Sequence, residues 1–180
     1  MFISLIAGTA IAQDQDISID REESRLWIEG SSNVNQFRCR AGRYNTDVAP
    51  PTTDTTTKVE VDVAVEGFDC GKRKMNNDMK DALKADRYPN IRFVYKKAES
   101  GANLSENNYI IYGELTVAGV TKEISFIAEG DVSENGEMRV RGNKKIFMTD
   151  YGIEPPTGLF GLIKADDELT VHFDLTAKRI

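Results

Sequence analysis

The chain has 180 residues, of which 40% are hydrophobic, and its formal net charge is −6. This length suits a single β-barrel or β-sandwich domain, because such folds often exceed the average domain size without dividing. The acidic balance argues against a nucleic-acid partner and against anionic membrane surfaces, since both attract basic side chains. The longest apolar run, residues 2–12, is too short to cross a bilayer, so we expect no transmembrane segment in the mature chain.

Residues 1–12 have the composition of a secretory signal peptide. The apolar run ends in Ala10-Ile11-Ala12, the small-x-small pattern that a signal peptidase recognises. No Lys or Arg precedes the run, which is consistent with a recorded start downstream of the true one. The alternative, a buried first strand, is disfavoured because the run lacks period-2 alternation. We therefore expect a signal peptide over residues 1–12, truncated or whole, and one periplasmic or secreted domain over residues 13–180.

The chain has two cysteines, Cys39 and Cys70, and each stands at the end of a predicted extended segment. In an exported chain such a pair is expected to form a disulfide. Closing a loop of about thirty residues stabilises a fold by about 3 to 4 kcal/mol in the chain-entropy model. A metal site is disfavoured, because two thiols and the lone His172 fall short of four ligands at recognisable spacing.

The first half of the chain predicts strands with one buried face. After a polar leader over residues 13–23, residues 24–30 predict a strand with Leu26 and Ile28 on one side. Residues 58–65 alternate strictly, with valine at every second position and mostly charged side chains between. A period of two places all the valines on the same face of a strand, so that face is expected to be buried.

One short helix interrupts the strands. The spacing of Met79, Ala82 and Leu83 predicts a helix over about residues 76–85 with one apolar stripe. Tyr88 then precedes a proline, and the residue before a proline avoids helical backbone, so the helix must end by this point. A stripe of Met and Leu is more often plain core than a ligand contact, and we expect the helix to pack on a barrel or close its end.

The second half predicts antiparallel strands in sequence order. Residues 109–117 and 122–130 flank a tight turn in which Gly119 is expected to have a positive φ. Residues 136–148 are predicted to pair with residues 168–177. The last of these strands alternates clearly between apolar and polar side chains, which defines its inner face. The inner face contains Leu169, Val171, Phe173 and Leu175.

Three motifs in this order resemble those of the YceI-like family. They are YPNIRF at residues 88–93, GELTVAGVTK at residues 113–122 and DYGI at residues 150–153. The resemblance covers roughly residues 24–177. It implies an all-β fold, a lipocalin-like antiparallel barrel of about eight strands with one short helix. It also implies that the barrel binds a polyisoprenoid lipid.

Barrels of about eight strands can hold one small apolar ligand. Each five-carbon prenyl unit buried is worth about 3 to 4 kcal/mol, whereas association costs about 4 to 15 kcal/mol, so long chains are favoured. We expect the ligand cavity to be lined by the apolar members of the alternating strands: Val61, Val63, Phe93, Leu115, Ile124, Phe126, Val171 and Phe173. The basic triplet Lys72, Arg73 and Lys74 would attract an anionic head group, and the alternative is a solvated turn.

The sequence contains no recognisable catalytic constellation. His172 falls on the outer face of its predicted strand, where replacement by alanine is expected to be nearly silent. Runs of acidic residues such as 166–168 are typical of solvated turns rather than of catalytic pairs. An enzyme using the cavity would need a carboxylate or tyrosine with a perturbed pKa inside it, for example Tyr109 or Tyr151.

Together these features favour a secreted or periplasmic protein that holds a polyisoprenoid or similar amphipathic lipid for transport, storage or sequestration. We expect no catalysis, no metal and no cofactor other than the bound lipid. Two alternatives stay open: a structural or adhesive β-domain with a filled core, and an enzyme that uses the cavity as its active site. The oligomeric state also stays open, a homodimer included.

Overall fold

The computed structural model describes residues 17–49, 58–101, 104–158 and 161–179. The predicted signal peptide lies outside these residues. In chain order the elements are β1 (Ile17–Ile19), β2 (Arg25–Ser32), β3 (Gln36–Ala41), β4 (Tyr44–Ala49), β5 (Lys58–Ala64), the 3-10 helix η1 (Val65–Gly67), β6 (Phe68–Asp69), α1 (Arg73–Ala82), β7 (Asn90–Glu99), β8 (Asn108–Val117), β9 (Val120–Val132), β10 (Met138–Phe147), the 3-10 helix η2 (Met148–Tyr151), β11 (Thr157–Gly158) and β12 (Ile163–Arg179).

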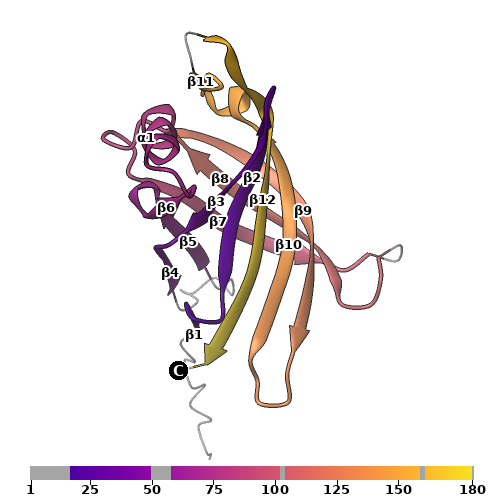
Figure 1. Ribbon diagram of the computed structural model, residues 1–180. Helices are drawn as coiled ribbons and strands as arrows, with labels where there is room; N and C mark the ends of the chain where they lie inside the picture. Colours follow the sequence, from indigo (N-terminus) through magenta and orange to yellow (C-terminus); the bar gives the residue numbers. More distant parts are fainter. Residues whose placement is uncertain (1–16, 50–57, 102–103, 159–160, 180) are drawn as a thin grey trace, which may run out of the picture.

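The described strands form one curled antiparallel sheet. Its order is β4-β5-β7-β8-β9-β10-β12-β2-β3-β6, with β1 and β11 paired to β12 outside this path. Figure 1 shows the sheet curling into a barrel with α1 at its upper end. This is the predicted lipocalin-like barrel with one short helix. The sheet has twelve strands rather than about eight, in part because β1, β6 and β11 have only two or three residues each.

The predicted C-terminal pairings are confirmed. Strands β8 and β9 meet at a two-residue turn, where Ala118 has φ 47° and Gly119 has φ 81°. Positive φ at both positions suits a turn whose twist matches that of the strands. Strand β10 pairs with β12 from Met138 opposite Ala177 to Phe147 opposite Glu168. The register places the apolar positions of β12 on the inside, as the alternation predicts.

The helix lies a few residues earlier than predicted. It begins at Arg73 rather than near residue 76, because Gly71 at φ 77° and an extended Lys72 turn the chain directly into it. It ends at Ala82 rather than near residue 85, and Lys84 has φ 54°, which a helix cannot contain. Apolar spacing located the stripe, whereas the backbone turns determine the ends.

The predicted polar leader contains a strand. Residues Ile17–Ile19 form β1 and pair with the last residues of β12, with Ile19 opposite Ala177. Three residues are too few for a period-2 pattern to be visible, and the partner strand is the most distant one in the sequence. Local patterning therefore could not show this pairing.

The core lies mainly beneath α1. One buried cluster joins the end of α1 to the β8–β9 turn and to η2, and it contains Val65, Leu83, Ala85, Val117, Ala118, Met148, Tyr151 and Ile153. The other joins β2, β3, β4, β5 and β6, and it contains Ile28, Cys39, Tyr44, Val63, Phe68 and Cys70. Met79 of α1 packs against both clusters. The predicted disulfide between Cys39 and Cys70 is present in the second cluster.

Candidate functional site

A largely apolar cavity of about 990 Å³ occupies the interior of the barrel. It extends from Val34 and Met75 at the α1 end to Tyr109 and Val132 at the opposite end. All eight side chains predicted to face the interior lie on its wall: Val61, Val63, Phe93, Leu115, Ile124, Phe126, Val171 and Phe173. Their role as ligand contacts stays a prediction.

Strand alternation explains which side chains reach the cavity. On β2, Leu26 and Ile28 line it, whereas Trp27 points outward and stacks on His172 of β12 with ring centroids 4.9 Å apart. Nε2 of His172 also lies 3.0 Å from a carboxylate oxygen of Glu29. The outer position of His172 agrees with the prediction. Because the ring is stacked, however, its replacement by alanine should no longer be nearly silent.

Three phenylalanines meet across the middle of the cavity. The centroid of Phe126 on β9 lies 5.8 Å from that of Phe93 on β7 and 5.3 Å from that of Phe173 on β12. Glycines on the intervening strands make this contact feasible. A Cβ on Gly113 of β8 would lie 2.4 Å from the Phe93 ring, and one on Gly142 of β10 would lie 2.8 Å from the Phe173 ring. The rings of Phe93 and Phe173 therefore occupy the space that side chains at positions 113 and 142 would otherwise fill.

The predicted head-group triplet is divided by the structure. Lys72 and Lys74 lie on the cavity wall at the α1 end, whereas Arg73 does not. The Lys74 ammonium bonds both carboxylate oxygens of Asp78 one helical turn further, at 2.8 and 2.7 Å. Of the triplet, Lys72 is therefore the residue that both lines the cavity and takes part in no ion pair within the described chain.

Few titratable side chains line the described wall. Asp78 is the single carboxylate among the described lining residues, and it is paired with Lys74. Tyr151 is buried, and burial raises the pKa of its phenol. Tyr109 stands apart from it, 38% exposed at the other end of the cavity. Within the described residues, no three His, Cys, Asp or Glu side chains are close enough to hold a metal ion together.

Besides Asp78, sequence reasoning missed one charged residue of the wall, Lys144 on β10. It lines the cavity together with Val140 and Ile146 of the same strand. These residues are separated by even numbers of positions and so lie on the same face of the strand, and the alternation of β10 could therefore have revealed Lys144. The signal is weak because Gly142, which shares the inward parity, has no side chain and the outward positions include Lys145.

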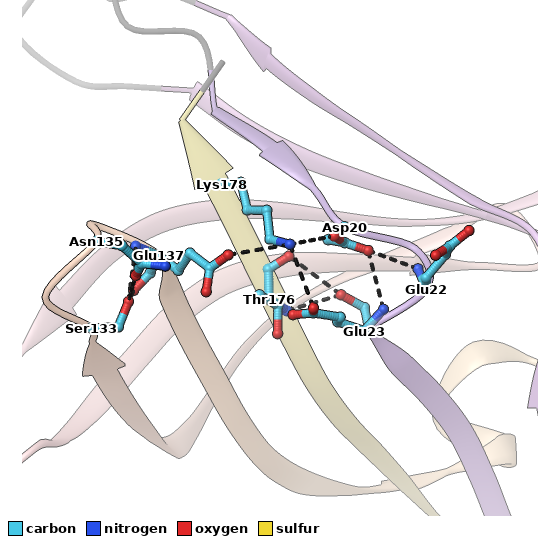
Figure 2. Close-up of polar contacts among 9 residues, drawn as sticks. Asp20, Glu22, Glu23, Ser133, Asn135, Glu137, Thr176 and Lys178 are labelled. Atoms are coloured by element: carbon cyan, nitrogen blue, oxygen red, sulfur yellow. Dashed lines mark hydrogen bonds and ion pairs between the residues drawn. The ribbon is translucent and has the colours of Figure 1, made fainter.

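The end of the barrel farthest from α1 is held by charge. Figure 2 shows the Lys178 ammonium between Asp20, Glu23 and Glu137, with nitrogen–oxygen distances of 2.7, 3.5 and 3.2 Å. The hydrogen bond from Lys178 is the main cause of the lowered pKa of the Asp20 carboxyl. The same bond is the main cause of the raised pKa of Lys178. These contacts join the β1–β2 turn, the end of β12 and the β9–β10 hairpin.

Comparison with known proteins identifies similar chains. A family model described as a YceI-like domain matches residues 18–177. The crystal structure of Burkholderia cenocepacia BcnA superposes with a TM-score of 0.72 at 18% identity, covering 89% of this chain and 99% of that one. A polyisoprenoid binding domain from Saccharophagus degradans, implicated in plant cell wall breakdown, gives 0.70 at 14% identity, covering 91% and 98%.

A Campylobacter jejuni YCEI protein gives a TM-score of 0.60 at 21% identity, covering 79% of this chain and 84% of that one. At these identities the structural likeness shows the shared fold. No curated protein sequence matches the chain. In the described part of the chain, no helix is long and apolar enough to span a membrane.

Proposed function

We propose that this chain, which belongs to the YceI-like domain family, binds one polyisoprenoid or similar amphipathic lipid in its barrel cavity. The protein would carry, store or sequester that lipid outside the cytoplasm without changing it chemically. The binding described for the similar Saccharophagus degradans domain supports the choice of ligand class.

The hollow interior is the observation that carries this proposal. Ligand pockets in proteins run from about 300 to 1,000 Å³, and a cavity of about 990 Å³ stands at the upper end of that range. A barrel whose side chains filled it, as a structural or adhesive domain requires, would leave no such space. The wall offers mostly aliphatic and aromatic side chains, which suit a long hydrocarbon chain.

Two further observations support the rest of the proposal. A disulfide between Cys39 and Cys70 favours an oxidising compartment such as the periplasm or the extracellular space. Inside the cavity, Asp78 is paired with Lys74, and Tyr109 lies apart from Tyr151. This arrangement offers few groups for acid–base catalysis. Carriage of a lipid therefore fits the site better than catalysis.

Mass spectrometry of a detergent-free lipid extract from the natively expressed protein is the first test. We expect one lipid with a long hydrocarbon chain per protein molecule. A protein free of lipid would favour the filled-core alternative. Calorimetric titration with prenyl alcohols of increasing length is the second test. Affinity should rise with each added unit until the cavity is full, because each unit buries further apolar surface. Affinity that ignores chain length would refute a hydrophobic cavity site.

A matched pair of variants localises the binding. Val171→Asp places a carboxylate on the cavity wall, whereas Thr170→Asp places it on the opposite face of the same strand, one residue earlier. We expect only the first to abolish binding. Circular dichroism of both variants shows that loss of binding is not loss of fold.

A further inference from the structure

Strands β9 and β10 stop pairing about half-way along β10. Their ladder runs from Met138 opposite Val132 to Gly142 opposite Ala128 and stops there. Both strands nevertheless continue, β9 back to Val120 and β10 on to Phe147. In Figure 1 the two strands are adjacent near their hairpin and then diverge, with β9 crossing behind toward α1. We call the stretch without main-chain pairing, residues 120–127 of β9 and 143–147 of β10, the β9–β10 window.

The window has a closed upper end. Beyond it, η2 returns to the β8–β9 turn, and Tyr151 packs in the same buried cluster as Val117 and Ala118. The Lys122 ammonium also lies 3.0 Å from a carboxylate oxygen of Asp150. The window is thus a bounded gap in the strand ladder, with paired residues on one side and a packed segment on the other.

Lys144 crosses this gap. Its ammonium donates a hydrogen bond to the main-chain carbonyl oxygen of Ser125 at 2.9 Å, so it reaches β9 where main-chain pairing is missing. Its side chain lines the cavity and is partly buried. It takes part in no ion pair within the described chain, unlike its neighbour Lys145, whose ammonium lies 2.7 Å from Glu168 on the outer face. One of its three donors is therefore used, by a neutral group.

Apolar side chains occur on both faces of the two strands that Lys144 joins. Outside the window, Ile127 is 53% and Phe147 is 45% exposed. Inside it, Ile124, Phe126 and Ile146 line the cavity. A lysine stem can lie along such surface while its ammonium reaches a polar partner. The window thus combines one positive charge outside any described ion pair with apolar side chains that line the same cavity.

We propose that Lys144 binds the anionic head group of the ligand at the β9–β10 window, with the apolar chain of the ligand inside the barrel. This inference rests on the proposed function and names the ligand class more narrowly: a single-chain amphiphile ending in a phosphate or carboxylate. Two free ammonium donors can bond the oxygens of such a head, and bonds between charged partners are the stronger kind. The other cavity cations are less suited, since Lys74 is neutralised by Asp78 and Lys72 is exposed to screening solvent.

The test uses one chain length with three heads: geranylgeraniol, geranylgeranyl phosphate and geranylgeranoic acid, each titrated calorimetrically into the purified protein. The wild type should bind at least one anion about tenfold more tightly than the alcohol, the size of effect expected for one charge-assisted contact near solvent. Lys144→Met should remove that preference, so the ratio of the anion affinity to the alcohol affinity should fall to about one, whatever happens to the affinity for the alcohol itself. Lys144→Arg should retain the preference, because it retains the charge.

Lys145→Met is the matched control, since it removes the adjacent charge from the opposite face, and the preference should survive it. Equal binding of all three heads by the wild type would overturn the head-group site and leave the cavity intact. Loss of the preference in Lys72→Met but not in Lys144→Met would also overturn it, by placing the head at the α1 end. Binding of none of the three ligands would instead refute the proposed function itself.

Discussion

The two ends of the barrel are held by different forces. At the α1 end, two buried apolar clusters meet around Met79, and the disulfide between Cys39 and Cys70 ties β3 to the segment that leads into the helix. At the opposite end, Lys178 bridges three carboxylates while Val132 is left 71% exposed. Buried apolar area contributes far more to stability than exposed ion pairs do. We therefore expect the α1 end to carry most of the free energy of unfolding.

The largest effect should follow from Val63→Asp at the α1 end. Val63 also lies on the cavity wall, but it is 6% exposed and packed within the second cluster, so the new carboxylate would meet apolar neighbours rather than water. We expect a loss of about 4 kcal/mol in the free energy of unfolding, measured by urea denaturation. Asp at the neighbouring outward position, Ala64→Asp, is the control and should cost much less. Equal losses would mean that the two faces of β5 are assigned wrongly.

Removal of the disulfide should have the next largest effect. The bridge spans 31 positions of sequence, and the chain-entropy model gives about 3 to 4 kcal/mol for a loop of that size. The double variant Cys39→Ala/Cys70→Ala should lose this amount in denaturant melts. Thiol labelling of the native protein, before and after reduction, should show no free thiol and then two. Two reactive thiols without reduction would contradict the bridge.

In the middle of the barrel, Phe126→Asp should cost less than Val63→Asp. The substitution removes two ring contacts, with Phe93 and Phe173, but the new carboxylate would face a cavity large enough to hold water. We expect a loss of about 2 to 3 kcal/mol in urea melts of the ligand-free protein. A larger loss than that of Val63→Asp would show that the middle of the barrel, rather than its α1 end, is the better packed region.

On the outer wall, His172→Ala should have a small effect. It removes the stack on Trp27 and the contact with Glu29, which together are worth about 0.5 to 1 kcal/mol. Thermal melts of the variant and the wild type at neutral pH provide the measurement. His172→Phe restores the stack alone and should recover most of the loss. Equal melting temperatures for the wild type and the alanine variant would show that the stack contributes nothing to stability.

The smallest effect should come from Lys178→Met at the far end, and it should depend on pH. The pKa of Asp20 is lowered from 3.8 in the folded chain, chiefly by Lys178. Its contribution to stability is therefore present above pH 3.8 and is lost as the pH falls through the lower folded value. The melting temperatures of variant and wild type should differ at neutral pH and converge in acid. Lys164→Met, an exposed lysine outside the described ion pairs, should show no such convergence.

Much of the fold follows from local patterns. The valines of residues 58–65 and the apolar positions of β12 alternate without interruption, so their inner faces could be assigned from the sequence. The ends of α1 could not, because they depend on left-handed backbone at Gly71 and Lys84 rather than on apolar spacing. Strand β1 could not either, since its partner comes from the opposite end of the chain.

The cavity was predictable only in part. Alternation shows which side chains face inward, but whether they fill the interior depends on the circumference of the sheet, which no single strand encodes. The β9–β10 window illustrates the same limit. It exists because the hydrogen-bonded pairing of β9 with β10 ends at Gly142, and the sequences of both strands beyond that point are still typical of paired strands. Lys144 was missed because the alternation of β10 is weak, with glycine at the inward position 142 and lysine at the outward position 145.

The position of Trp27 has an optical consequence. It is the single tryptophan of the chain, it stacks on His172 with an interplanar angle of 2°, and the guanidinium carbon of Arg38 lies 5.8 Å from its ring centroid. All three groups belong to the outer surface of β2, β3 and β12. Tryptophan fluorescence therefore monitors the integrity of this wall rather than the contents of the barrel. An emission-detected melt and a calorimetric titration will accordingly report on two separate parts of the same molecule.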